Sequence, residues 1–336
     1  MKKRICILYT GGTIGMVPSE KGYVPSSGAF LDLLRAIPDL YWADMPEWDV
    51  VEFEPLLDSS DITVREWNQI GSAIAERYND YDGFVVLHGT DTMAYSASAI
   101  SFMLENLSKP VIFTGSQIPL GQIRSDGRDN IISSLLIAAS GQVHEVCIYF
   151  NGVLLRGNRS TKRSSDQFEA FESPNDAPLA HAGIQIEYKK RVLRPASSEP
   201  FRLQPFKELP IGVIKIFPGI QFELFEQIVS EKLSGVVLET FGEGNIPSNN
   251  RTLVSSIRRA SENGAIVSVC SQCYRGTTKL GTYATSNALK ESGAVGCNDM
   301  TTEAAVTKLY YLFSCGYPKE TIKKLMTTNL RGEISV

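Results

Sequence analysis

The feature that most constrains the fold is a unit that recurs four times in the first 140 residues: a short apolar run, a polar turn and a segment with helical spacing. The apolar runs are Arg4–Tyr9, Val50–Leu57, Gly83–Leu87 and Pro110–Phe113. Buried strands that alternate with helices are typical of a parallel sheet with helices on both faces. The sequence therefore predicts an α/β fold built on a doubly wound sheet.

Each run ends in a turn rich in hydroxyl and carboxylate side chains. In an open α/β sheet the carboxyl ends of parallel strands meet at one edge, and ligands bind there. We therefore predict that one rim of the sheet forms a pocket for a small polar substrate. Its predicted lining residues are Thr13, Ser59, Thr90, Asp91 and Ser116.

The stretch Val85–Ala99 predicts a buried strand, a sharp turn and a helix whose first turn contains Thr90 and Asp91. Free backbone N–H groups at the start of a helix could hold an anion beside these side chains. Threonine and aspartate are also preferred helix caps, so capping is the simpler interpretation of this stretch taken alone. In the same way, Asp61 could cap the helix that follows it.

The glycine-rich turn Thr10–Gly15 does not have the spacing of a dinucleotide-binding loop. It lacks G-x-G-x-x-G, and the residues after it favour turns rather than a helix, so the phosphate interpretation fails. A long loop rich in Gly, Pro and Ser is uncommon unless it is functional or disordered, and residues 15–28 are predicted to form a lid over Thr13. Tyr23 is its only aromatic residue; its hydroxyl could reach the site, or it could be an exposed loop tyrosine.

A hairpin and a basic segment follow. Asn151-Gly152 between apolar runs is a strong hairpin signal. The segment Arg156–Arg163 carries four cations, which ordinarily indicate a solvated loop, and this interpretation applies to Lys162 as well.

Two domains are predicted. Polar residues and prolines at 195, 200 and 205 mark a linker, which we place at 189–210. The larger N-terminal domain then covers 1–188, and a smaller C-terminal α/β domain covers 211–336. The strands predicted in the second domain are Ile211–Phe217, Gly235–Leu238 and Ala265–Val269.

Composition and charge argue against several classes of function. With 336 residues, 43% of them apolar, and a formal net charge of −4, the chain can form full hydrophobic cores but offers no basic surface for nucleic acid or an anionic membrane. No apolar run approaches the ~20 residues that span a bilayer, and the run after the basic N-terminus is too short for a secretory signal. We therefore expect a cytoplasmic protein without nucleic-acid or membrane partners.

The cysteines and histidines do not predict a metal or redox centre. Cys270 and Cys273 have the spacing of a half-site, but no second pair occurs, and His88, His144 and His181 show no ligand spacing. The six cysteines are expected to be reduced. Neither a metal nor a cofactor is expected.

The polar rim favours hydroxyl-based acyl transfer on a small polar amide or ester. A threonine hydroxyl is a weak nucleophile until a base removes its proton, and a tyrosinate or a desolvated lysine can do so. A carboxylate beside the lysine would orient it, and backbone N–H groups near Thr90 could stabilise an oxyanion. The sequence contains no G-x-S-x-G, H-E-x-x-H or P-loop motif, which argues against the common alternatives.

Two long segments, Tyr9–Gly15 and Gly83–Ala94, look like the signature motifs of the bacterial-type L-asparaginases. The resemblance extends through shorter segments over nearly the whole chain. These are Asp58–Asp61, Pro110–Gln117, Ser125–Gly127, Arg156–Lys162 and Gly242–Asn245. The Asp58-Ser-Ser form and the lack of a leader are similar to the cytoplasmic, type I branch.

The resemblance implies that the chain hydrolyses L-asparagine to L-aspartate and ammonia. Thr13 matches the nucleophile that takes up the β-aspartyl group, and Tyr23 matches the flexible-loop tyrosine that assists it. Thr90, Asp91 and Lys162 match a second catalytic cluster. Under this resemblance, Thr90 and Asp91 are more than helix caps, and Lys162 is more than a solvated cation.

The resemblance also implies how the substrate is held. Asp58, Ser59 and Ser60 match the residues that bind its α-carboxylate and α-amino groups, and Asp91 shares the amino group. The family further implies a homotetramer, a dimer of intimate dimers, with active sites between the amino domain of one subunit and the carboxyl domain of its neighbour.

Two departures from the family pattern are visible. Periplasmic relatives lend a glutamate from the partner subunit to the substrate, and no clear counterpart occurs near Tyr274–Tyr283. Some cytoplasmic relatives respond to asparagine at an effector site that includes an arginine, where this chain has Glu239. Because a carboxylate repels the carboxylate of the effector, we expect weak or absent activation.

Three alternatives remain at this point. Glutamine could be the better substrate, as in a glutaminase-asparaginase of broader specificity. The tRNA-dependent amidotransferase component that shares this fold carries an added amino-terminal domain, whereas the catalytic motifs here begin near residue 1. A non-catalytic amino-acid sensor would be expected to lose Thr13 or Lys162, and both are present.

Overall fold

The computed structural model describes residues 2–20, 22–25, 28–247, 249–281 and 284–335. It divides the chain into two compact units. The first comprises Met1–Ser173 and Ala177–Gln204, and the second comprises Pro174–Asp176 and Pro205–Val336. The fold class predicted from the sequence, a larger α/β domain followed by a smaller one, is confirmed.

An eight-stranded mixed sheet forms the centre of the first unit, in the order β13-β12-β9-β8-β7-β5-β1-β4. The strands β4, β1, β5, β7 and β8 are parallel, and β9, β12 and β13 continue the sheet antiparallel. Their bounds are β1 Arg4–Gly11, β4 Glu47–Leu57, β5 Gly83–Leu87, β7 Val111–Thr114, β8 Val146–Phe150, β9 Val153–Arg156, β12 Ala180–Ala182 and β13 Ile186–Tyr188. The four predicted strands are confirmed, and so is the hairpin, since Asn151 and Gly152 connect β8 to β9 with positive φ angles.

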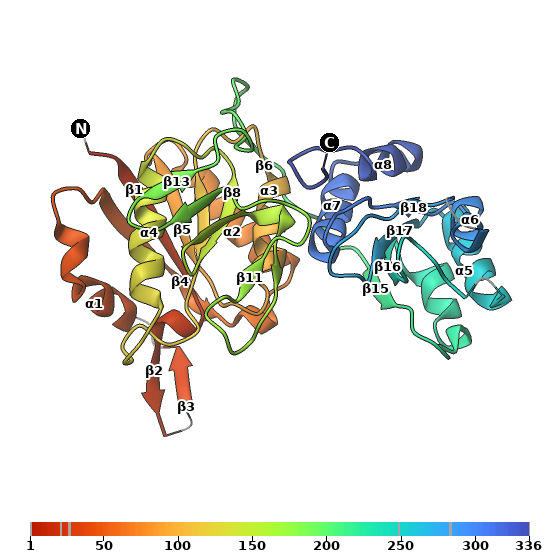
Figure 1. Ribbon diagram of the computed structural model, residues 1–336, viewed down its shortest axis with the longest axis horizontal. Coiled ribbons are helices and arrows are strands. Elements are labelled where there is room, and N and C mark those ends of the chain that lie inside the picture. Colours follow the sequence, from red (N-terminus) through yellow and green to blue (C-terminus); the bar gives the residue numbers. More distant parts are fainter. Residues whose placement is uncertain (1, 21, 26–27, 248, 282–283, 336) are drawn as a thin grey trace. The chain divides into compact units, whose positions relative to one another are not determined.

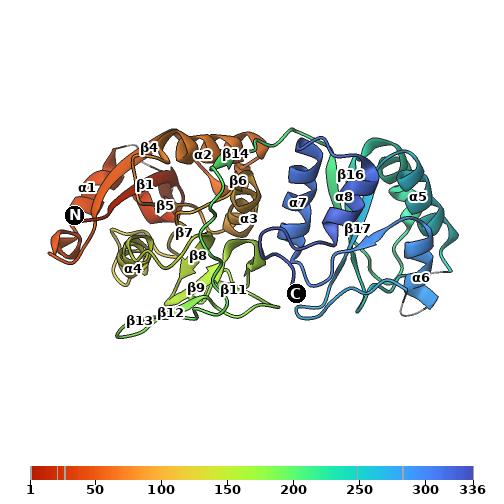
Figure 2. The same ribbon diagram turned by 90° about the horizontal axis from the view of Figure 1, so that it is seen from above.

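Helices cover both faces of the parallel part, as a doubly wound sheet requires. They are α1 Ala29–Arg35, α2 Val64–Arg77, α3 Met93–Met103 and α4 Gly127–Ala139. In Figure 1 the colours of the elements follow their order in the chain. Figure 2 shows α2 and α3 on one side of these strands and α4 on the other. Side chains alternate along a strand, so Ile5, Ile7 and Tyr9 of β1 share one core with Phe30 of α1 and Leu135 of α4. Because both faces are buried, the strands read as continuous apolar runs.

The starts of two helices differ from the sequence predictions. Helix α3 begins at Met93 after Thr92, so Thr90 and Asp91 precede the helix and do not lie in its first turn. Helix α2 begins at Val64 and is capped by Thr63, not by Asp61. Thr63 forms a capping box with Glu66, in which each side chain satisfies a backbone N–H of the other; Asp61 has no such partner three residues on.

Residues 15–28 were expected to be an irregular lid, but most of the described part forms a hairpin. Strand β2 (Met16–Ser19) pairs antiparallel with β3 (Gly22–Pro25). The Ser19 hydroxyl donates to the Gly22 carbonyl at 2.7 Å and closes the turn. In Figure 1 the hairpin extends away from the sheet. Residues 21, 26 and 27 lie outside the described residues.

Short elements complete the first unit. They are η1 Thr13–Gly15, η2 Pro38–Tyr41, η3 Ser59–Asp61, β6 Leu104–Glu105, η4 Gly157–Arg159, β10 Thr161–Lys162, β11 Phe171–Glu172 and β14 Arg202–Leu203. Strand β14 lies within the segment 189–210 and pairs with β6. The boundaries of that segment as an interdomain linker stay a prediction.

The second unit contains a four-stranded parallel sheet in the order β15-β16-β17-β18. The strands are β15 Ile211–Lys215, β16 Gly235–Thr240, β17 Ile266–Ser271 and β18 Val295–Gly296. The helices are α5 Arg251–Glu262, α6 Ala284–Glu291, α7 Thr302–Ser314 and α8 Lys319–Met326. Two short helices, η5 Phe222–Leu224 and η6 Ile228–Lys232, complete the unit. The three predicted strands are confirmed. Across the described ranges, no helix combines the length and the apolar composition needed to cross a bilayer.

A fully buried ion pair anchors the end of the chain. Lys308 of α7 lies 2.6 Å from a carboxylate oxygen of Glu333, and both side chains are 0% exposed. The ammonium also donates to the Thr328 carbonyl at 2.6 Å, and Glu333 accepts from the backbone N–H of Leu330. The C-terminal segment is therefore held by a charge pair whose remaining hydrogen-bonding groups are also satisfied.

Replacing Glu333 with alanine is expected to destabilise the protein by about 3–5 kcal/mol, because it leaves the Lys308 ammonium buried without a counter-charge. Urea unfolding followed by circular dichroism measures the change. The control is Glu320→Ala, which removes the 83% exposed partner of Lys323. A Glu333→Ala variant no less stable than this control would show that the buried pair does not hold the segment.

Candidate active site

Three turns at the carboxyl ends of β1, β4 and β5 lie against one another. A Cβ atom on Gly12 would lie 2.5 Å from the Gly89 nitrogen, and one on Gly89 would lie 2.4 Å from the Ser59 hydroxyl oxygen. Gly12 also has a φ of +87°, which other residues rarely adopt. The two glycines therefore let the turns that carry Thr13, Ser59 and Thr90 approach to contact distance. This is the rim predicted from the sequence.

Thr13 is the first residue of η1, directly after Gly12. It is half-buried, and its carbonyl accepts a hydrogen bond from the Met16 N–H. Within the described part of the chain, no group forms a hydrogen bond with its hydroxyl. The backbone of Thr13 is thus fixed while its hydroxyl is uncommitted, which suits a nucleophile.

Thr90, Asp91 and Lys162 form a hydrogen-bonded cluster. The Lys162 ammonium donates to the Thr90 hydroxyl oxygen at 2.9 Å and to the Asp91 carboxylate at 2.7 Å. Thr90 is buried, and the Lys162 side chain is 19% exposed. A lysine that bonds a hydroxyl on one side and a carboxylate on the other can exchange a proton with the hydroxyl while the carboxylate orients the amine.

Lys162 is held by the segment that precedes it. Strand β10 pairs with β11, and η4 packs on α3, where the Ser98 hydroxyl donates to the Gly157 carbonyl at 3.4 Å. The Ser160 hydroxyl donates to the Arg156 carbonyl at 2.7 Å. Lys162 therefore projects from a fixed backbone.

The interpretation of the basic segment as a solvated loop is wrong for Arg156, Arg159 and Lys162, which are largely buried, whereas the Arg163 side chain is 56% exposed. Arg156 is buried and pairs with Glu145 of the β7-to-β8 connection at 2.5 Å. Arg159 is 2% exposed. A buried arginine needs a carboxylate or carbonyl partner. The partner of Arg156 is the carboxylate of Glu145, which lies 11 residues away in the sequence.

The turn Asp58–Asp61 follows β4 and is organised by Asp58. One oxygen of its carboxylate accepts from the Ser60 N–H at 2.9 Å and from the Ser60 hydroxyl at 2.8 Å. The Thr92 hydroxyl donates to the Ser59 carbonyl at 2.6 Å, which joins this turn to the one that carries Thr90. The predicted binding residues and the cluster thus share one connected rim.

Ser116, which was predicted to line the rim, is 1% exposed, and its hydroxyl has no partner among the described groups. Tyr23 also stands apart from the cluster. It lies on β3, its side chain is 49% exposed, and its hydroxyl has no hydrogen bond to any described residue. Strand β3 contacts η1, so the hairpin is attached next to Thr13. Its role at the site stays a prediction.

Sequence reasoning missed the side chains that support the rim. Gln117 accepts from the Thr90 hydroxyl at 3.3 Å, and Asp126 accepts from the Gln117 backbone N–H at 3.0 Å. Asn130 of α4 donates to the Gly115 carbonyl at 3.0 Å. These residues lie within the segments singled out above or in α4. The sequence alone, however, does not show which groups a polar side chain beside a turn will bond.

His88 is a buried neutral base next to Gly89. Its Nδ1 lies 2.7 Å from the Gly89 carbonyl oxygen, and its Nε2 has no partner among the described groups. Burial lowers the pKa of His88 to about 4, although the hydrogen bond to the Gly89 carbonyl opposes the shift. The imidazole therefore stays uncharged at neutral pH and fixes the turn as a hydrogen-bond donor.

His88 should make stability fall in acid. Between pH 6.5 and 4 the unfolded chain binds the His88 proton and the folded protein does not, so stability decreases as pH falls through this window. The loss is about 3 kcal/mol at most. We expect His88→Gln to flatten this part of the stability–pH curve, measured by urea unfolding. Replacing the exposed His181 should leave the slope unchanged, and an unchanged slope in His88→Gln would contradict this role of His88.

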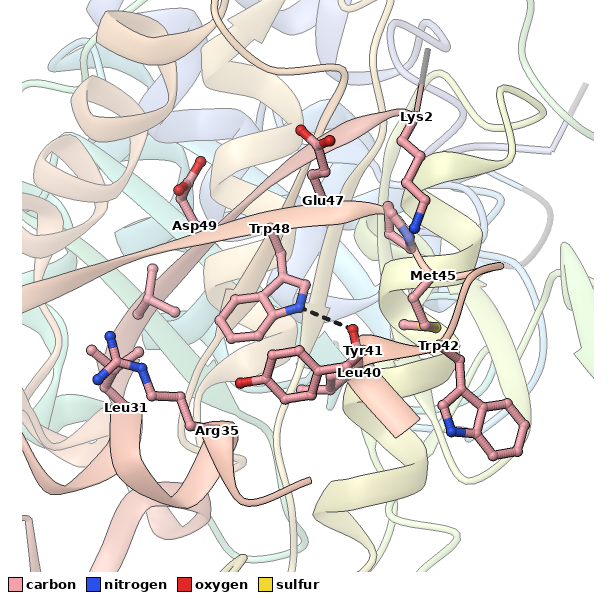
Figure 3. A pocket seen from close by; sticks show the side chains of 12 residues that line it. Lys2, Leu31, Arg35, Leu40, Tyr41, Trp42, Met45, Glu47, Trp48 and Asp49 are labelled. Carbon is pink, nitrogen blue, oxygen red and sulfur yellow. Dashed lines mark hydrogen bonds between the residues drawn. The ribbon is translucent and has the colours of Figure 1, made fainter. Parts of the chain in front are cut away.

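A separate hollow of about 620 Å³ lies at the amino end of β4 and contains none of the predicted site residues. Tyr41 and Trp48 meet edge to face there with ring centroids 6.2 Å apart, whereas the Trp42 ring points away from them (Figure 3). Asp58 follows the opposite end of the same strand. The hollow is therefore distinct from the rim that carries Thr13 and Thr90.

The fold is that of a two-domain α/β protein, with hydroxyls, an amine and a carboxylate gathered at one rim of its larger sheet. Family models match both parts of the chain: "Asparaginase, N-terminal" at residues 4–194 and "Glutaminase/Asparaginase C-terminal domain" at residues 210–326. The chain belongs to the asparaginase family.

Individual relatives agree with this assignment. L-asparaginase 1 of Escherichia coli K12 is 46% identical over 99% of this chain and 98% of its own. The crystal structure of L-asparaginase I from Vibrio cholerae matches with a TM-score of 0.93 at 44% identity, over 100% of both chains. The thermostable L-asparaginase from Thermococcus kodakarensis matches with a TM-score of 0.89 at 29% identity, over 99% of both chains.

Proposed function

We propose that the protein hydrolyses L-asparagine to L-aspartate and ammonia. The family membership supports this activity, and one observation carries the catalytic proposal: the Lys162 ammonium bonds Thr90 and Asp91 at the rim where the Thr13 hydroxyl is uncommitted. The resemblance assigns no metal or cofactor, and the proposed chemistry uses hydroxyl, amine and carboxylate groups alone.

The proposed mechanism is a double displacement. The Thr13 oxygen attacks the side-chain amide carbon and loses its proton, with Tyr23 assisting. The amide nitrogen takes up a proton and leaves as ammonia, and a β-aspartyl ester remains on Thr13. Water then attacks the ester, aspartate leaves, and the hydroxyl of Thr13 is restored.

The second cluster divides the remaining work. Asp91 orients Lys162 and shares the substrate's amino group, and Thr90 relays a proton between Lys162 and the reacting atoms. Asp58, Ser59 and Ser60 hold the α-carboxylate and α-amino groups. The Asp58 carboxylate supplies a charge of the right sign for the amino group, and the Ser59 hydroxyl can donate to the carboxylate. The Ser60 hydroxyl donates to Asp58 in this structure, so it has to turn away from Asp58 before it can donate to the substrate.

The assembly and compartment of the protein are also proposals. We infer a homotetramer, a dimer of intimate dimers, in the cytoplasm, on the strength of the likeness to the type I branch. Analytical ultracentrifugation measures the assembly directly, and a monomer at micromolar concentration would contradict it.

Ammonia release from a panel of amides tests the substrate. We expect kcat/KM to be highest for L-asparagine, lower for L-glutamine, and at background for amides that lack an α-amino or α-carboxylate group. A glutamine value equal to or above that for asparagine would make the protein a glutaminase-asparaginase. Tight binding without ammonia release would make it a sensor.

Glu239 bears on regulation by the substrate. It lies near the end of β16, and its carboxylate accepts from the Thr302 hydroxyl at 2.7 Å. Since this negative charge stands where relatives with an effector site have an arginine, we expect hyperbolic kinetics without activation by asparagine. A sigmoidal rate curve that Glu239→Ala abolishes would contradict this.

A further inference from the structure

The Thr90 hydroxyl is held from two sides. Lys162 donates to its oxygen at 2.9 Å, and Thr90 itself donates to the side-chain oxygen of Gln117 at 3.3 Å. An ammonium group has no lone pair, so the proton of Thr90 cannot point at a charged Lys162. The hydroxyl proton therefore points at Gln117.

The amide of Gln117 has a fixed orientation. Its Nε2 donates to the backbone carbonyl of Gln167 at 3.0 Å. A carbonyl can only accept, so it selects the nitrogen end of the amide and turns the oxygen end toward Thr90. Gln117 is thus presented to Thr90 as an acceptor.

The backbone of Gln117 is fixed as well. Both carboxylate oxygens of Asp126 accept from its N–H at 3.0 Å, and one of them accepts from the Ile118 N–H at 3.1 Å. Asp126 immediately precedes α4. The turn after β7 is therefore tied to the start of a helix, which fixes the position from which the Gln117 side chain reaches Thr90.

We propose that Gln117 is a positioning residue that controls the direction of the Thr90 hydroxyl and, through it, when Lys162 becomes a base. This inference rests on the proposed function of Thr90 and Lys162. The acceptor at 117 favours the arrangement in which Lys162 is charged and Thr90 points away from it. When Lys162 loses its proton, the Thr90 O–H turns from Gln117 to the amine, and its proton can then pass from the Thr90 oxygen to the Lys162 nitrogen.

The strength of the acceptor at 117 should set the pH at which this pair becomes active. The other charged groups beside it are Asp91, which bonds Lys162, and Asp126, which bonds backbone N–H groups. Arg163, directly after β10, pairs with Glu172 of β11 at 3.0 Å. Substitutions at 117 leave all of these in place.

The test is kcat and KM for asparagine across pH in Gln117→Leu and Gln117→Glu. Leucine removes the acceptor, so we expect kcat to fall about 10-fold while KM stays within about twofold of the wild-type value. The acid limb of the kcat profile, where the rate falls as pH is lowered, should move to lower pH. Glutamate is a stronger, charged acceptor, so its acid limb should move to higher pH. Gln142→Leu, an exposed glutamine after α4, is the matched control and should behave as wild type.

Shifts of opposite sign in the two variants support the proposal, because a merely structural role does not predict them. Acid limbs that stay in place or move in the same direction would overturn it. Lys162→Met is assayed in parallel. If that variant is active, the proposed function fails; if it is inactive while the Gln117 acid limbs do not move, only the role of Gln117 fails.

Discussion

Replacing Thr13 with alanine is expected to reduce asparagine hydrolysis by at least about 10⁴-fold while substrate still binds. Thr13 supplies the attacking oxygen in the proposed mechanism, and its hydroxyl has no hydrogen bond to another described residue that its removal would leave unpaired. Steady-state ammonia release measures the rate, and isothermal titration with aspartate measures binding.

Thr13→Ser is the matched variant, because it keeps the hydroxyl and removes only a methyl group. It should retain measurable turnover, whereas Thr13→Ala should not. Substantial turnover in Thr13→Ala with normal binding would exclude Thr13 as the nucleophile and direct attention to Thr90, the other threonine of the rim.

Replacing Lys162 with methionine is expected to reduce kcat by about 10³-fold or more, with the fold intact. Methionine keeps the unbranched side chain as far as Cε but removes the amine that bonds Thr90 at 2.9 Å and Asp91 at 2.7 Å. Loss of a general base that also orients a relay costs about 10²–10⁴-fold. The rate is measured by ammonia release, and the fold is checked by circular dichroism and thermal unfolding.

Arg163→Met controls for the loss of a positive charge beside Lys162. Arg163 pairs with Glu172, and its side chain is 56% exposed. We expect this control to keep nearly full activity. An Lys162→Met variant as active as Arg163→Met would return Lys162 to the solvated cation that the basic segment first suggested.

The sequence predicts the sheet better than the helix starts, and the reason is physical. Runs such as Gly83–Leu87 are buried on both faces, so consecutive apolar residues identify them as strands. The start of a helix depends on which of several neighbouring polar residues caps it. Helix α2 is capped by Thr63, because Glu66 completes its capping box, and helix α3 begins after Thr92.

The same contrast holds at the site. Glycines mark the turns because only they allow the backbones around Gly12 and Gly89 to touch, and this signal is local. Lys162 and Thr90 are 72 residues apart, and Gln117 reaches Thr90 from 27 residues away. No spacing rule predicts such contacts. Family resemblance identified Lys162, whereas Gln117 becomes visible only when the hydrogen bonds are traced.

The measurement that tests the central claim most directly is the location of the acyl group. Enzyme mixed with asparagine is quenched in acid during turnover, digested, and mapped by mass spectrometry. We expect a β-aspartyl ester on the peptide that contains Thr13, and none in Thr13→Ala. An ester on Thr90 or elsewhere, or turnover with no covalent adduct under conditions in which deacylation limits the rate, would contradict the assignment of Thr13 as the nucleophile.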